Sequence, residues 1–134
     1  MNSPKVNPNN YKLRIIFFPS VMSDNPYWNL LVEEINTVGG RVTEFAPQNL
    51  TLGWLIQNLS QIEILHFHYI QGFYRSTSLI KKCVKLIRYT INLFIAKILG
   101  YKIVFTLHNA LPTYPINPPW LDDVAYWFTI KFSS

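Results

Sequence analysis

An apolar, β-branched segment that stops abruptly on two polar residues places the strongest constraint on the fold of this chain. Residues 103–107 read Ile-Val-Phe-Thr-Leu, and His108 and Asn109 follow directly. A buried parallel strand is a continuous apolar run, and the ligand-binding groups of open α/β sheets gather at the carboxyl ends of such strands. Residues 62–68 (Ile-Glu-Ile-Leu-His-Phe-His) end in the same way, so all three histidines of the chain close predicted strands.

Apolar segments alternate with helical repeats along the chain. Asn25 and Pro26 are typical of a helix start, because asparagine caps free backbone N–H groups and proline fits the first turn. Glycines at 39, 40 and 100 are typical of helix ends. In chain order we expect a strand at 13–19, a helix at 27–38, a strand at 41–45, a short helix at 52–59, a strand that ends at 68, a helix at 78–99, a strand that begins after 100 and a helix at 120–132.

This alternation predicts an α/β fold, with a Rossmann-like doubly wound parallel sheet and right-handed crossovers. The simplest strand order is 3-2-1-4. Residues 1–11 are polar and are expected to form a disordered amino terminus, and residues 12–134 are expected to form one domain. The chain ends directly after the last helix, where a doubly wound sheet would return with a fifth strand. We therefore expect the domain to be incomplete.

Positive charge is unevenly distributed in this chain of net charge +5. No acidic residue lies between Glu63 and Asp122, whereas seven lysines and arginines do. A region of one sign attracts phosphate groups or anionic lipid headgroups. Nucleic acid is not expected as a partner, because the aromatic residues do not interleave with the basic ones. The single cysteine, Cys83, favours a reducing compartment, and no signal peptide is visible.

Several common active sites lack their sequence signals. The loop after the first strand, residues 19–26, contains no glycine, which disfavours a dinucleotide site or a Walker-type phosphate loop. There is no Gly-x-Ser-x-Gly elbow for a hydrolase triad. Three histidines at strand ends could converge on zinc, but no supporting carboxylate pattern accompanies them, so we expect no metal site.

The histidines and nearby aromatic residues have structural as well as functional interpretations. His66 suits a hydrogen-bonded place within the sheet, whereas His68 and His108 stand at its rim, where packing and function are about equally plausible. Asn25 and Tyr27 begin a helix whose free N–H groups suit an anionic or hydroxyl-bearing ligand, or they form a plain cap with packing. Tyr69 could supply a stacking surface for a sugar ring or could belong to the core.

The helix expected at 78–99 carries two apolar faces. The stripe expected to face the sheet consists of Ile80, Val84, Ile87, Ile91, Phe94, Ile95 and Ile98. On a second face, Leu79, Leu86 and Leu93 recur every seven residues. The candidate membrane-surface cations are Lys81, Lys82, Lys85 and Arg88. The surplus of apolar surface favours an anionic membrane or a partner protein, or else a helix buried on two sides in a larger enzyme.

Together these residues resemble the amino-terminal domain of GT-B glycosyltransferases of the glycosyltransferase-4-like, or group 1, type. The resemblance covers residues 13–132. It rests on Asn25-Pro-Tyr27, on Ile64-Leu-His-Phe-His68, and on Ile103-Val-Phe-Thr-Leu-His-Asn109 followed by Pro112. One branch of this family is similar in ending one strand with HLHW and another with T-x-HN-x-x-P-H. Tyr69 stands here in place of that tryptophan.

The resemblance implies an acceptor-side domain, with the nucleotide-sugar donor held by a second, carboxyl-terminal domain that is absent from this chain. Catalysis would occur in the cleft between the two domains. The resemblance makes His108 the candidate catalytic residue. The acceptor-binding residues that it implies are Asn25, Tyr27, His68, Tyr69 and Asn109.

The implied acceptor is a glycolipid or polysaccharide, and the implied location is the cytoplasm, peripheral on the inner face of the cell membrane. No cofactor is expected in this chain itself. We expect the chain alone to be inactive as a transferase, because donor binding is missing. The alternative is a non-catalytic, flavodoxin-like subunit for interaction or membrane docking.

Overall fold

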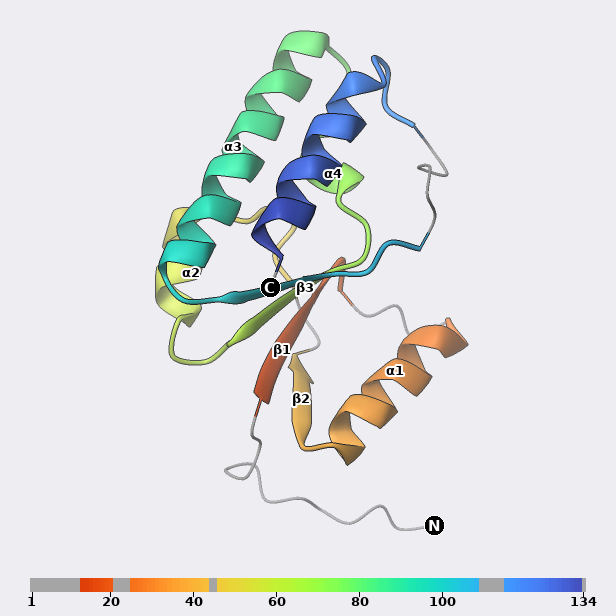
Figure 1. The fold of residues 1–134 in the computed structure, drawn as a ribbon, viewed down its shortest axis with the longest axis vertical. Coiled ribbons are helices and arrows are strands. Elements are labelled where there is room, and N and C mark those ends of the chain that lie inside the picture. Colours follow the sequence, from red (N-terminus) through yellow and green to blue (C-terminus); the bar gives the residue numbers. More distant parts are fainter. Residues whose placement is uncertain (1–12, 21–24, 44–45, 109–114, 134) are drawn as a thin grey trace.

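A four-stranded, all-parallel sheet forms the centre of the molecule (Figure 1). The computed structural model describes residues 13–20, 25–43, 46–108 and 115–133, so the disorder expected for residues 1–11 lies outside them. The elements in chain order are β1 (Leu13–Phe18), α1 (Pro26–Thr37), β2 (Gly40–Thr43), α2 (Leu52–Asn58), β3 (Ile64–Phe67), the 3-10 turn η1 (Gln71–Phe73), α3 (Leu79–Ile98), β4 (Lys102–Phe105) and α4 (Trp120–Phe132). The predicted α/β alternation is confirmed.

The strands lie in the order β2-β1-β3-β4, so the predicted order 3-2-1-4 is wrong. The composition of the strands explains the difference. β2 carries exposed Arg41, which suits an edge, whereas the predicted order places this strand inside the sheet. In contrast, Ile15, Ile16, Phe17 and Phe18 of β1 are all buried, which suits a strand covered on both faces.

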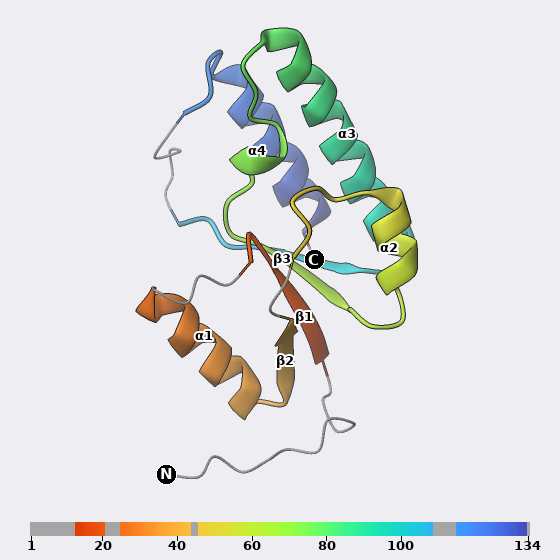
Figure 2. The same cartoon turned by 180° about the vertical axis from the view of Figure 1, so that it is seen from behind.

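Helices cover both faces of the sheet, as Figures 1 and 2 show from opposite sides. α1 packs on one face, where Trp28 meets Phe17. α2, α3 and α4 share a core with Phe18 and Phe67 on the other face. Right-handed crossovers that run in opposite directions place their helices on opposite faces. The direction reverses after β2, so β1 and β3 flank the switch point, where ligands bind at the carboxyl ends of such sheets.

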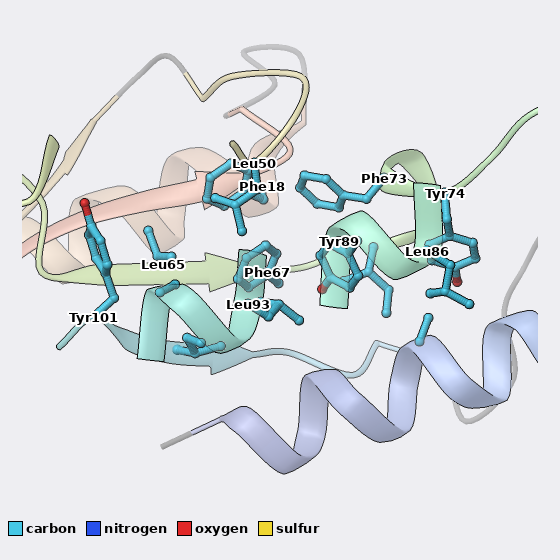
Figure 3. Packing of buried hydrophobic residues seen from close by; sticks show 14 of the residues in the cluster. Phe18, Leu50, Leu65, Phe67, Phe73, Tyr74, Leu86, Tyr89, Leu93 and Tyr101 are labelled. Carbon is cyan, nitrogen blue, oxygen red and sulfur yellow. The ribbon is translucent and has the colours of Figure 1, made fainter. Parts of the chain in front are cut away.

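α3 buries the face opposite to the one predicted. Tyr89 and Leu93 lie beside Phe67 of β3, and Leu86 lies beside Tyr74 in the same core (Figure 3). The stripe that was expected to face the sheet is largely exposed: Ile80, Val84, Ile87, Ile91, Phe94 and Ile98 each keep 51–77% of their surface open. The predicted orientation of this helix is therefore wrong, although its bounds agree with the prediction to within one residue at each end.

Polar groups on the buried side of α3 explain its orientation. The Asn92 side chain donates a hydrogen bond to the Leu50 carbonyl at 2.7 Å. The Tyr89 and Thr129 hydroxyls lie 2.9 Å apart, which ties α3 to α4. A buried polar group costs free energy unless it finds a partner, and both partners lie on this side.

A buried carboxylate joins α4 to the segments around it. The Tyr74 hydroxyl donates to Asp122 Oδ1 at 2.6 Å, and the Ile116 backbone N–H donates to Asp122 Oδ2 at 2.7 Å. Asp122 lies in the first turn of α4, where a negative charge is favourable. In the structure it also fixes the entry of the chain into α4, because both of its oxygens are engaged with partners outside the helix.

We expect Tyr74→Phe to lower the free energy of unfolding by about 2 kcal/mol, because it removes a hydrogen bond to a buried charged group. Chemical denaturation of the variant and the parent measures this difference. Tyr69→Phe, at an exposed tyrosine, is the matched control and should change the free energy by less than about 0.5 kcal/mol. An equal, negligible loss for both variants would contradict the role assigned to Asp122.

No helix among the residues that the structure describes is long and apolar enough to cross a membrane.

Candidate functional site

Three segments converge at the carboxyl edge of the sheet. His68 directly follows β3, and its backbone N–H donates to the Phe18 carbonyl at 2.8 Å, which extends the pairing of β3 with β1. His108 comes three residues after the end of β4. Tyr27 lies in the first turn of α1, which follows β1. Parallel strands place their carboxyl ends at the same edge, so segments far apart in sequence meet here.

The side chains of these segments form one cluster, which we call the imidazole–tyrosine cluster: His68, His108, Tyr69 and Tyr27. His68 Nδ1 and His108 Nε2 lie 3.1 Å apart, within hydrogen-bond distance. The Tyr69 ring stacks on His108 at 5.0 Å between centroids. The Tyr27 ring meets His108 edge-on at 5.5 Å. His108 is therefore held between two aromatic rings and one imidazole.

Exposure divides the cluster into an inner and an outer part. His68 is only 3% exposed, and Trp28 packs edge-on against it at 4.4 Å. Tyr27 and Tyr69 keep 42% and 49% of their surface, and His108 is also exposed. The outer three rings can contact a ligand directly, whereas His68 can act on a ligand only through His108.

His66 has the structural role that was one of its interpretations. Its Nε2 lies 2.8 Å from the hydroxyl of Thr106, which directly follows the adjacent strand β4. Its ring stacks on His68 at 4.1 Å, so it also forms one wall of the cluster. The hydroxyl partner was not identified from sequence, although a threonine inside an apolar strand is the signal that could have indicated it.

Burial keeps the two inner imidazoles in the neutral form. Burial, together with the nearby His108 ring, lowers the pKa of His66 to about 4. Burial likewise lowers the pKa of His68 to about 3, with added contributions from His66 and His108. Near neutral pH, each of these two rings therefore carries a single N–H group.

This neutrality decides how His68 and His108 share a proton. His68 Nε2 is buried and has no hydrogen-bond partner within the part of the chain that the structure describes. A buried N–H without a partner is rarer than a buried acceptor without one. The favoured arrangement therefore places the His68 proton on Nδ1, where it is donated to His108 Nε2. A neutral His108 ring then carries its own proton on Nδ1 and offers a ligand a hydrogen-bond donor.

The remaining predicted acceptor residues have different positions. The Asn25 side chain accepts from the Tyr27 backbone N–H at 3.0 Å, which caps α1 and places Tyr27 in the cluster. Asn25 itself is exposed. Asn109 lies outside the described residues, so the prediction for it stays a prediction. Trp28, which follows Tyr27 in α1, packs directly against His68 at the inner wall of the cluster.

The cations predicted for a membrane surface lie along α3. The Lys82 and Lys85 amino groups donate to backbone carbonyls, of Asn117 at 2.6 Å and of Arg75 at 3.0 Å. Arg88 donates to the Asn49 side-chain oxygen at 3.3 Å. Lys81 is exposed at the amino end of the helix. These four residues are thus separate from the imidazole–tyrosine cluster and do not contribute to it.

A cavity of about 390 Å³ lies at the opposite edge of the sheet. Its lining includes Glu63, which directly precedes β3, and Lys102, which is the first residue of β4. The Glu63 carboxylate already accepts from the Arg14 backbone N–H at 2.9 Å and pairs with its guanidinium at 3.7 Å. Because its charged group is engaged and it lies at the amino ends of the strands, this cavity is the weaker candidate site.

Comparison with protein-family models, curated proteins and solved structures finds no match for this chain. Among the described residues, no group of three or more histidine, cysteine, aspartate or glutamate side chains could hold a metal ion. The chemistry of the site therefore has to be inferred from the imidazole–tyrosine cluster itself.

Proposed function

We propose that this chain is the acceptor-side domain of a glycosyltransferase that transfers a sugar from a nucleotide-sugar to a lipid-linked or polysaccharide acceptor. The observation that carries the proposal is the position of His108, exposed at the carboxyl edge, hydrogen-bonded to buried His68 and flanked by Tyr69 and Tyr27. The resemblance of the three strand-end segments to glycosyltransferases of the group 1 type supports it.

The cluster has the chemistry that a saccharide requires. Sugar rings present C–H faces that stack on aromatic rings, and hydroxyls that need hydrogen-bond partners. Tyr69 and Tyr27 offer exposed aromatic surface, and their hydroxyls can donate or accept. His108 offers an N–H that could contact a hydroxyl or phosphate oxygen near the reacting centre. A proton transfer by His108 requires that oxygen within about 3 Å of its ring.

In this proposal His68 is a positioning residue. Its lowered pKa keeps the ring neutral, and its hydrogen bond fixes the orientation of His108 and the nitrogen that carries the His108 proton. An imidazole held in this way does not have to be ordered when the acceptor binds, which lowers the entropic cost of binding. Donor binding is assigned to a separate nucleotide-binding domain, as the resemblance implies.

Acceptor binding tests the proposal with the chain as it is. Saturation-transfer NMR with short-chain glycolipids and oligosaccharides should show contact with the parent. Tyr69→Ala and His108→Ala should each weaken that contact at least tenfold, because each removes stacking surface or a donor from a small site. Trp120→Ala, at an exposed aromatic of α4, is the matched control and should leave binding unchanged. Binding that is equal in all four proteins would overturn the assignment.

Transfer of a radiolabelled sugar tests the catalytic part. We expect no turnover from this chain alone, and turnover when a nucleotide-sugar-binding domain is supplied with it. In that mixture, His108→Gln should lower kcat about 100-fold or more, as expected for the loss of a group that acts on the reacting oxygen. Transfer by the chain alone, or an unchanged kcat for His108→Gln, would contradict the role proposed for His108.

A further inference from the structure

We propose that the protein docks on an anionic lipid bilayer through the outer surface of α3 and α4. This inference does not depend on the proposed transferase activity. It rests on what we call the α3–α4 ridge, a set of large apolar side chains on the outer surface of the two helices, of which seven are more than half exposed and Phe128 and Phe132 are half-buried. The ridge comprises Ile80, Val84, Ile87, Ile91, Phe94 and Ile98 of α3 and Trp127, Phe128 and Phe132 of α4.

The six α3 members lie on one line along the helix. Their spacing alternates between four and three residues, which keeps them on one side of an α-helix. From Ile80 to Ile98 the line is about 27 Å long at 1.5 Å per residue. Each of the six side chains is more than half exposed. Scattered apolar residues on a surface are ordinary, but a continuous apolar line of this length marks an interaction surface.

The apolar surface continues from α3 onto α4, which lies beside it in both views (Figures 1 and 2). Phe94 of α3 contacts Phe132 of α4 with ring centroids 5.9 Å apart. Phe132 stacks on Phe128 at 6.1 Å, and Phe128 meets Trp127 at 4.8 Å. The surface is therefore two helices wide, broader than the narrow seam that a single partner helix covers.

Positive charge flanks this surface. Lys81 and Arg88 each follow a ridge residue directly in sequence, Lys97 precedes one, and all three are exposed. On α4, the Lys131 amino group lies 5.5 Å from the centroid of the exposed Trp127 ring. α3 contains no aspartate or glutamate. An apolar helical surface with tryptophan and flanking lysines and arginines suits the boundary between headgroups and acyl chains of an anionic bilayer.

The same charges argue against a second copy of this chain as the occupant. If two α3 helices paired along the ridge, Lys81 and Arg88 of one copy would flank a seam that carries only cations. Like charges beside a helical seam are unfavourable, and α3 offers no carboxylate to offset them. An anionic surface relieves this repulsion instead of adding to it.

Vesicle sedimentation tests the proposal. We expect the parent to sediment with vesicles of phosphatidylglycerol and phosphatidylcholine in a 3:7 ratio, and at least tenfold more weakly with phosphatidylcholine alone. Ile87→Asn together with Ile91→Asn removes apolar contact, and Lys81→Glu together with Arg88→Glu reverses the flanking charge. Each pair should weaken binding to the anionic vesicles at least tenfold. Raising the salt concentration to 0.5 M should also weaken binding of the parent to the anionic vesicles, because salt screens the charge of the headgroups.

Leu30→Asn is the matched control, because Leu30 is an equally exposed apolar residue on α1, on the other face of the sheet. It should bind vesicles as the parent does. Far-UV circular dichroism verifies that every variant is folded, which these exposed positions should permit. A parent that stays in the supernatant, equal binding to both vesicle types or an equal loss in Leu30→Asn would overturn the proposal. A dimer that the Ile87 and Ile91 substitutions dissociate, without vesicle binding, would identify a second copy as the occupant instead.

Discussion

Leu93→Ala should lower the free energy of unfolding by about 3 kcal/mol, whereas Ile91→Ala should lower it by less than about 1 kcal/mol. Leu93 is fully buried in the core between α3 and the sheet (Figure 3), so its truncation leaves a cavity. Ile91 is 52% exposed on the α3–α4 ridge, so its truncation removes apolar surface that water already reaches. The two residues lie two positions apart on one helix and have similar helix propensities. The difference between the two losses of stability therefore shows which face of α3 is buried.

Denaturant unfolding of the two variants beside the parent measures this difference. The slopes of the unfolding curves should be equal, so that the midpoints report stability alone. If Ile91→Ala is the more damaging variant, α3 presents to the sheet the face that the sequence periodicity predicted, and the proposed bilayer surface is lost with it. Equal losses for both variants would point to a helix that is buried on two sides.

Stability should fall steeply as the solution is acidified below pH 6.5. The unfolded chain binds a proton at His66 and at His68 with ordinary pKa values near 6.5. In the folded chain these pKa values are about 4 and about 3, because burial opposes the charged form. Between these limits the unfolded state binds more protons than the folded state, so the free energy of unfolding rises with pH. At pH 5 the difference is a little under two protons, so the free energy of unfolding should change by roughly 2–3 kcal/mol per pH unit.

Unfolding curves collected at intervals from pH 7 to pH 4.5 measure this slope. His68→Asn keeps a donor or acceptor near the position of Nδ1 but cannot become a cation. It should therefore reduce the slope of unfolding free energy against pH by nearly the contribution of one proton. His66→Gln, which replaces Nε2 with an amide, should do the same. Contributions from groups that do not interact with these histidines cancel in the comparisons with the parent. A slope that neither substitution changes would show that the two histidines remain accessible to protons in the folded protein.

Element type and element bounds could be predicted because local signals agree with the fold. Asn25 and Ser78 cap α1 and α3 through their side chains, and Gly39 and Gly100 adopt positive φ angles after those helices end. Such positions need particular residue types for local reasons, namely free N–H groups at one end and left-handed backbone at the other. Trp120–Phe132 forms a helix with the predicted bounds.

Strand order could not be predicted, because it depends on which apolar surfaces meet and not on local signals. Arg41 in β2 indicates an edge strand, whereas the simplest winding order places β2 inside the sheet. The predicted orientation of α3 is wrong for a related reason. Both of its faces are apolar, so periodicity alone cannot rank them. Which face is buried depends on Tyr89 and Asn92, whose hydrogen-bond partners lie about 40 residues away in the sequence.

The candidate site was predicted in part. The apolar runs that end at His68 and His108 indicated that both residues lie at the carboxyl edge, and the structure brings their rings into contact there. Sequence could not show that His68 is buried and that His108 is held between Tyr69 and Tyr27, because these contacts join two loops and the first turn of α1. The partnership of Tyr74 with Asp122 was also missed, although an aspartate within the buried stripe of α4 was a visible signal.

The most direct test of the central claim is a titration of the ¹³C-labelled histidine side chains followed by NMR. With a glycolipid or oligosaccharide acceptor, the His108 ring resonances should shift most, those of His68 less, and those of His66 least, because His108 alone is exposed beside the two tyrosines. Tyr69→Ala should abolish these shifts. If every acceptor and every nucleotide-sugar leaves the His108 resonances in place, the imidazole–tyrosine cluster does not bind saccharide.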